Sequence, residues 1–257
     1  MAGLLDGRTV VVSGVGPGLG REVALAAGRD GANVVLGGRT EAKLKAVAAE
    51  LDRVAYAVTD IVDENACAAL VQTAVDAFGG VDAIVHVAAR EDGFGTLLDG
   101  DFELWRGAFE TNVIGTLQLT KAAVPELEKR GGAVVFIGTQ AAFQPQLPQP
   151  AYAVSKGALL TSMYYLANEL GPKKIRVNTV VPTWMWGPQV EAYAQYKADK
   201  KGVGIEEVRA GLAKNMPLGE VPEDADVANA AVFFVSDRAR MVTGQTLFVN
   251  AGEYYRS

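Results

Sequence analysis

The feature that most constrains the fold is a set of short apolar segments without polar alternation. Thr9–Ser13 (TVVVS), Ala83–Val87 (AIVHV) and Ala133–Ile137 (AVVFI) are apolar at nearly every position. A strand with one face in water would alternate apolar and polar residues, so these runs indicate parallel strands that are covered on both faces. Longer alanine-rich segments follow them, and this strand–helix alternation is typical of a doubly wound α/β sheet.

The same pattern predicts the remaining elements. Further strands are expected at Asn33–Leu36, Val54–Val58, Arg176–Val181 and Thr246–Val249, and helices at Leu19–Asp30, Glu41–Leu51, Glu64–Phe78, Asp101–Lys129, Tyr152–Leu170 and Asp224–Ser236. We therefore predict that residues 1–257 form one domain, a Rossmann fold with a mostly parallel seven-stranded sheet and helices on both faces. Residues 182–222 are apolar yet irregular, and we interpret residues 183–217 as a binding loop or lid.

Composition excludes several classes of protein. The net charge of −6 argues against a nucleic-acid surface, which needs basic stripes. The single cysteine, Cys67, excludes an internal disulfide and suits a reducing compartment, so we predict a cytoplasmic protein. We see no signal peptide and no apolar run long enough for a membrane span. With only one histidine, His86, we predict no metal site.

The glycine-rich stretch Ser13–Gly20 (SGVGPGLG) lies between the first strand and the first helix. Glycine lets the backbone approach a pyrophosphate closely, and the helix N-terminus adds free N–H groups and partial positive charge. This context favours a dinucleotide site over an ordinary structural turn. The predicted contacts are Gly14, Pro17, Gly18, Leu19 and Gly20.

Residues 150–156 read PAYAVSK, in which a tyrosine precedes a lysine by four positions. On a helix Tyr152 and Lys156 would share one face. A phenol has a pKa of about 10, and a nearby ammonium lowers it, so Tyr152 is a candidate acid or base. The alternative is a surface tyrosine whose ring covers a lysine stem.

Together these motifs resemble the short-chain dehydrogenase/reductase family over nearly the whole chain. The family's glycine pattern T-G-x-x-x-G-x-G is present with Ser13 in place of threonine, and its Y-x-x-x-K is Tyr152–Lys156. Thr139 occupies the position of the family's catalytic serine, thirteen residues before the tyrosine. Asn112 matches the family's helical asparagine, and Thr243–Gly252 resembles its closing strand.

The resemblance implies an NAD(P)-dependent enzyme that interconverts a secondary alcohol and a ketone. It implies that Tyr152 exchanges a proton with the substrate and that Lys156 lowers the pKa of Tyr152 and binds the nicotinamide ribose. It also implies that Thr139 positions the substrate oxygen and that Asn112 holds a water. Related enoyl reductases place the tyrosine six residues before the lysine, and because this spacing is absent here, reduction of a carbon–carbon double bond is disfavoured. A 3-oxoacyl thioester reductase, a nucleotide-sensing protein without activity and a structural assembly subunit remain alternatives.

The end of the second strand bears on the choice of cofactor. NAD enzymes usually place an acid where this chain has Gly38, whereas Arg39 and Thr40 follow here. Arginine binds a 2′-phosphate in a forked geometry, so NADP(H) is favoured over NAD(H). The alternative is that Arg39 only stacks on adenine. Further cofactor contacts are predicted at Asp60, Ile61, Ala88, Pro182 and Met185, besides Tyr152 and Lys156.

One motif departs from the family. The family's N-N-A-G motif is replaced by H-V-A-A, His86–Ala89, in this chain. The two asparagines that in the family brace the central sheet and the adenosine side of the cofactor are therefore missing. We interpret His86 as a buried structural residue, and the change weakens the expected hold on the cofactor.

The irregular segment suggests the substrate. Gln140, Trp184, Trp186 and Tyr193 are predicted to line a roomy apolar pocket for a bulky cyclic, aromatic or steroid-like small molecule. The alternative is that these aromatic residues pack in the core or between subunits. From the resemblance we expect a homotetramer or homodimer, with no nucleic-acid or membrane partner.

Overall fold

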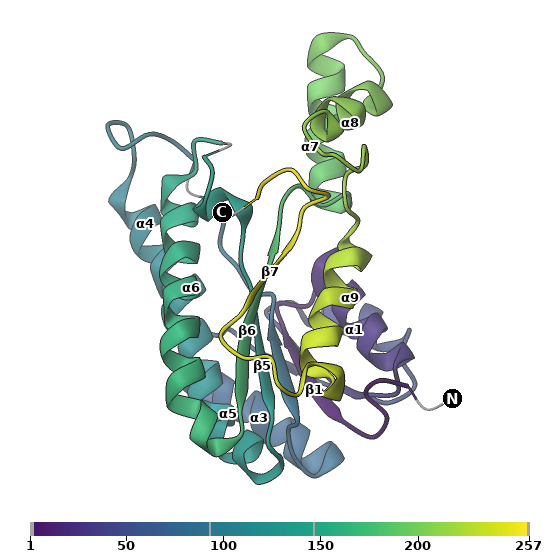
Figure 1. Cartoon of the computed structure of the whole chain (residues 1–257), viewed down its shortest axis with the longest axis vertical. Coiled ribbons are helices and arrows are strands. Elements are labelled where there is room, and N and C mark those ends of the chain that lie inside the picture. The colour runs from purple at the N-terminus through teal and green to yellow at the C-terminus, as the bar shows by residue number, and fades with distance from the viewer. Residues whose placement is uncertain (1–2, 93, 146, 256–257) are drawn as a thin grey trace.

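A computed structural model describes residues 3–92, 94–145 and 147–255. Its centre is one seven-stranded parallel sheet with strand order β3-β2-β1-β4-β5-β6-β7 (Figure 1). The strands are β1 (Thr9–Ser13), β2 (Asn33–Gly38), β3 (Val54–Val58), β4 (Ala83–His86), β5 (Ala133–Ile137), β6 (Arg176–Pro182) and β7 (Thr246–Val249). The predicted doubly wound Rossmann fold is confirmed. The strand order reverses direction between β1 and β4, and ligands of such sheets bind beyond the carboxyl ends at this point.

Helices cover both faces of the sheet. One face carries α1 (Leu19–Arg29), α2 (Glu41–Ala48) and α9 (Asp224–Val235), and the other carries α3 (Glu64–Phe78), α5 (Thr116–Arg130) and α6 (Pro150–Leu170). Successive side chains of a strand point to opposite faces, so Val10 and Val12 of β1 pack in the first core and Val11 in the second. All three are completely buried, and each full burial contributes about 1.5–3 kcal/mol.

The segment predicted as one helix over Asp101–Lys129 is interrupted. It consists of α4 (Phe102–Phe109), a π-helical turn at Glu110–Gly115 and then α5. Asp101 caps α4, since its carboxylate accepts a hydrogen bond from the Glu103 N–H at 2.8 Å. Short π-helical turns often mark functional sites.

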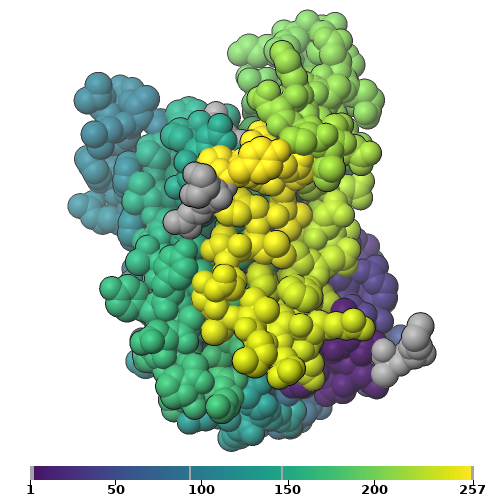
Figure 2. Space-filling model, viewed as in Figure 1, coloured from purple at the N-terminus to yellow at the C-terminus, as the bar shows by residue number. Residues whose placement is uncertain are grey.

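Residues 182–222 are not irregular, which corrects the prediction. They hold the end of β6 and two helices, α7 (Pro188–Lys201) and α8 (Ile205–Ala213). Both stand beyond the carboxyl edge of the sheet, where they project above the rest of the surface (Figures 1 and 2). Helix α7 buries only the small side chains Ala194 and Ala198, so its sequence lacks a broad apolar stripe.

Over the described part of the chain, no helix combines the length and the apolar character that crossing a membrane requires.

Candidate active site

A large cleft opens at the carboxyl edge of the sheet, above β1 and β4. Its volume is about 1290 Å³, more than the roughly 300–1,000 Å³ of a typical small-ligand pocket. The glycine loop, the start of α6 and the segment that leads into α7 all contribute to its lining. The cleft therefore has room for an extended ligand together with a second, smaller one.

The glycine loop has a backbone that side chains would block. Gly14 has a φ of +88°, and a Cβ there would lie 2.2 Å from the backbone nitrogen of Ala88. Gly18 has a φ of +106° and is the N-cap of α1, without a capping side chain. The first N–H groups of α1 are therefore open toward the cleft, as an anion site at a helix N-terminus requires. The loop fits a dinucleotide pyrophosphate.

The far end of this wall is polar and carries positive charge. All four residues predicted there, Arg39, Thr40, Asp60 and Ile61, line the cleft. Lys43 lines it too, with its Cδ 3.8 Å from where a Cβ of Gly16 would lie. Sequence reasoning missed Lys43, which lies in the first turn of α2, shortly after Arg39 and Thr40.

The motif PAYAVSK lies in the first turns of α6, with Pro150 at the helix start. Tyr152 and Lys156 face the same way, and the Lys156 Nζ lies 5.9 Å from the centroid of the Tyr152 ring. The ammonium donates a hydrogen bond to the carbonyl of Ile137, at the end of β5, at 2.7 Å. This bond anchors a buried cation at the centre of the cleft.

Burial shifts both groups away from their charged forms. Burial, as the largest cause, and the charge of Glu91 together raise the pKa of Tyr152 to about 12, against the lowering effect of a hydrogen bond with Thr139. Burial lowers the pKa of Lys156 to about 8, and Glu91 opposes it. The net shift of the Tyr152 pKa is therefore upward because burial dominates, whereas the lowering expected from Lys156 stays a prediction. At neutral pH both side chains carry their protons.

Thr139 lies beside Tyr152 in the cleft. Its side chain caps a 3₁₀ turn, Gln140–Ala142, by accepting a hydrogen bond from the Ala141 N–H at 3.3 Å. Its hydroxyl also interacts with the Tyr152 phenol, as the pKa of that phenol reflects. A hydroxyl and a phenol thus face the same space.

Asn112 is completely buried in the π-helical turn and does not line the cleft. Its side chain accepts from the Arg90 N–H at 2.7 Å and donates to the Arg90 carbonyl at 2.9 Å. It also donates to the Ser155 hydroxyl at 2.9 Å. Asn112 therefore fixes the loop after β4 against α6, and its role in holding a water stays a prediction.

Two of the predicted substrate residues lie elsewhere. Gln140 is completely buried, donates to Glu253 at 2.9 Å and accepts from Asn250 at 2.8 Å. Trp186 packs beneath Arg209, whose Cζ lies 4.5 Å from the ring centroid. Neither borders the cleft. The prediction failed because proximity in sequence to Thr139 and Trp184 does not decide which way a side chain points.

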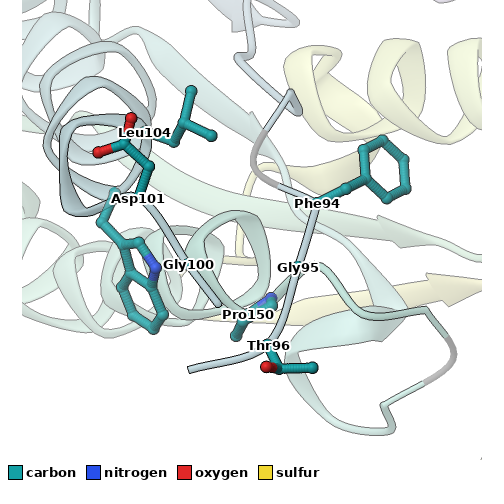
Figure 3. A pocket seen from close by; sticks show the side chains of 8 residues that line it. Phe94, Gly95, Thr96, Gly100, Asp101, Leu104 and Pro150 are labelled. Carbon is teal, nitrogen blue, oxygen red and sulfur yellow. The ribbon is translucent and has the colours of Figure 1, made fainter. Parts of the chain in front are cut away.

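The other two predicted substrate residues do line the cleft. The rings of Trp184 and Tyr193 stack with centroids 5.4 Å apart. Phe94 and Leu147, which sequence reasoning missed, add apolar surface. A small recess nearby, which includes Thr96, Asp101 and Pro150, holds only about 10 Å³, the space of a single water (Figure 3). The main cleft thus combines apolar lining with the polar end near Arg39.

His86 has a structural environment. Burial, with the charge of Lys156, lowers its pKa to about 3, so the ring is neutral. Its Nε2 lies 3.0 Å from the Thr120 hydroxyl, which donates its own proton to the Thr116 carbonyl. Nε2 must therefore carry the imidazole proton, while Nδ1 faces the Ser13 hydroxyl at 3.5 Å. The ring bridges the central strands and α5.

Comparison with known proteins identifies the family. A family model described as Enoyl-(Acyl carrier protein) reductase matches residues 14–253. Dehydrogenase/reductase SDR family member 4 of Homo sapiens is 33% identical over 96% of this chain and 88% of its own. The chain belongs to the short-chain dehydrogenase/reductase family.

Two further members of the short-chain dehydrogenase/reductase family are similar throughout. The 7alpha-hydroxysteroid dehydrogenase of Escherichia coli (strain K12) is 31% identical over 96% of this chain and 94% of its own. A variant of actinorhodin polyketide ketoreductase, solved with NADPH, is 27% identical with a TM-score of 0.87, covering 99% of this chain and 100% of that one. The chain is thus an oxidoreductase of a family that binds NAD(P)(H).

Proposed function

We propose that this protein interconverts a secondary alcohol and a ketone on a bulky apolar substrate, with NADP(H) as the preferred cofactor. The observation that carries the proposal is the shared cleft. Thr139, Tyr152 and Lys156 lie in it between an uncapped helix N-terminus and an apolar wall. A bound nicotinamide would supply or accept the hydride.

The side chains would move the proton. In the reducing direction Tyr152, which holds its proton at neutral pH, donates it to the carbonyl oxygen as negative charge develops there. Thr139 donates a hydrogen bond to the same oxygen and fixes its position. Lys156 stabilises the phenolate that remains, because a buried cation near the ring favours negative charge.

The apolar wall supports a large substrate. Trp184 and Tyr193 offer a stacked aromatic surface, and Phe94 and Leu147 also line the cleft. Two relatives are named for a hydroxysteroid and a polyketide, which agrees with a bulky ketone. Three residues separate Tyr152 from Lys156, which disfavours enoyl reduction, and a 3-oxoacyl thioester remains the rival substrate.

Charge supports NADP(H). Arg39 and Lys43 are exposed in the cleft, and neither forms an ion pair with another residue that the structure describes. Gly38 provides no carboxylate to repel a 2′-phosphate there. Removing both cations, in Arg39→Ala with Lys43→Ala, should weaken NADPH binding at least tenfold and leave NADH binding within about twofold.

We also propose a homodimer or homotetramer that works in the cytoplasm. Large apolar side chains are exposed on the side of α4 and α6, among them Leu98 at 93% and Tyr165 at 75% exposure. Association would cover such a surface.

The test combines binding and turnover. Tryptophan fluorescence should report binding of NADPH and NADH, and a panel of steroid, bicyclic aromatic and 3-oxoacyl thioester ketones should reveal turnover. Tyr152→Phe should lower kcat by at least about a hundredfold without changing cofactor affinity, while Tyr164→Phe, on the same helix, should behave like the wild type. Full activity in Tyr152→Phe, or no binding of either cofactor, would overturn the proposal.

A further inference from the structure

A buried carboxylate lies beside the glycine loop. Asp224, the first residue of α9, is 8% exposed and lines the cleft. No described residue donates a hydrogen bond to its carboxylate or forms an ion pair with it. Burying an unpaired charge is costly, so a carboxylate kept in this position calls for a ligand or a proton.

Asp224 packs closely against two glycines. A Cβ on Gly187, the N-cap of α7, would lie 2.1 Å from the Asp224 Oδ2. A Cβ on Gly18, the N-cap of α1, would lie 3.3 Å from the same oxygen. The carboxylate is therefore in contact with the backbone at the open end of α1, where a pyrophosphate would bind.

The charges around Asp224 disfavour its ionised form. Burial, as the largest cause, and the charges of Glu22 of α1, Glu191 of α7 and the adjacent Glu223 together raise its pKa to about 6. Arg209 is 3.9 Å from Glu223 and so moderates one of these charges. An ionised Asp224 would repel a phosphate, whereas the neutral acid has an O–H to donate.

We propose that Asp224 belongs to the pyrophosphate site and that a nicotinamide dinucleotide binds with uptake of one proton by this carboxylate. The neutral acid then donates a hydrogen bond to a phosphate oxygen. The inference rests on the proposed function, since it assumes that the cleft takes a dinucleotide. Proton uptake by Asp224 would make the affinity for the cofactor rise as the pH falls, separately from any effect of pH on the chemical step.

The experiment measures NADH affinity against pH, from about pH 5.5 to about pH 8. NADH is the probe because its pyrophosphate does not titrate in this pH range. NADPH carries in addition a 2′-phosphate that does titrate there and would obscure the effect of Asp224. In the wild type, once the pH is high enough to ionise Asp224 in the free protein, the Kd for NADH should rise by up to about tenfold per pH unit. Calorimetry in buffers of different ionisation enthalpy should show uptake of about one proton per NADH at the alkaline end.

Two variants make the test specific. Asp224→Asn keeps the shape and a permanent donor, so its NADH affinity should be high at every pH, with no proton uptake. Asp226→Asn is the matched control on the same helix, because Asp226 accepts from the Glu223 N–H at 2.9 Å and lies outside the cleft lining. It should follow the wild type. If the asparagine variant folds poorly, Asp224→Ser replaces it in the test. Serine is smaller and neutral, so the NADH affinity of this variant should also be independent of pH.

The outcomes separate the two proposals. Wild-type binding that does not change with pH, or the same pH dependence in Asp224→Asn, would overturn the role of Asp224 alone. Absence of NADH and NADPH binding at every pH would overturn the proposed function itself.

Discussion

The two walls of the cleft are built in different ways. At the glycine loop the backbone itself forms the surface, and Gly14 approaches Ala88 so closely that no side chain fits. At the aromatic wall the surface includes the side chains of Trp184 and Tyr193, whose rings stack. A backbone wall suits a ligand that is always the same, such as a cofactor, and a side-chain wall can change with the substrate without altering the fold.

The supports of the two walls differ as well. The glycine loop follows β1, whose valines are completely buried in the main cores. Helix α8, which packs against α7, rests on a small cluster whose buried members are Ala213, Met216 and Val221. Fewer buried contacts lower the free energy of local opening, so we expect the second wall to be the more mobile one.

The largest effect should come from breaking the backbone wall. Gly14→Ala combines a left-handed φ with a clash against Ala88, so it should lower the free energy of unfolding by about 3 kcal/mol or more and abolish NADPH binding. Gly211→Ala in α8 is the control, because a Cβ there meets nothing within 4 Å. It should be neutral or slightly stabilising in urea unfolding. If Gly14→Ala and Gly211→Ala lowered stability and NADPH binding equally, the proposed difference between the two walls would be wrong.

A substitution in the aromatic wall should change the KM for the ketone substrate. Trp184→Ala removes half of the aromatic stack, so it should raise the KM for bulky ketones about tenfold and leave the Kd for NADPH within twofold. Trp186→Ala is the matched control, since Trp186 packs near the same cluster but does not line the cleft. It should alter stability rather than KM. An equal rise of KM in both variants would assign the effect to the packing of α8.

The pH dependence tests the residues between the walls. Lys156 has its pKa lowered to about 8, so it loses its proton above that pH and no longer stabilises the Tyr152 phenolate. The kcat for ketone reduction, measured at saturating cofactor, should therefore fall up to tenfold per unit above about pH 8. Lys156→Met should show a low kcat without this limb. A wild-type profile that stays flat well above this pH would contradict the assignment.

The smallest effect concerns Asp224, at the contact between the walls. Its folded pKa of about 6 lies above the ordinary 3.8, so the folded state binds more protons than the unfolded state between these values. Wild-type stability should therefore fall as the pH rises through this window. Asp224→Asn should be more stable by about 1–2 kcal/mol near pH 7.5 and not near pH 4 in urea unfolding. A stability difference that does not vary with pH would refute this.

Much of the fold was predictable because the information lies within single elements. Unbroken apolar runs such as Val10–Val12 identify buried parallel strands, and glycines between a strand and a helix identify the loop. Tyr152 and Lys156 were found because a spacing of four brings side chains together on any helix. Helix α7 was missed because its buried side chains are small.

Contacts between distant elements could not be predicted in this way. Gln140 turns inward because Asn250 and Glu253 of the C-terminal segment meet it, and Asp224 meets the glycine loop because α9 packs beside α1. The upward pKa shift of Tyr152 likewise follows from desolvation by the whole cleft. Periodicity and spacing record the geometry of one element at a time, whereas burial and the direction of a side chain are set when elements pack together.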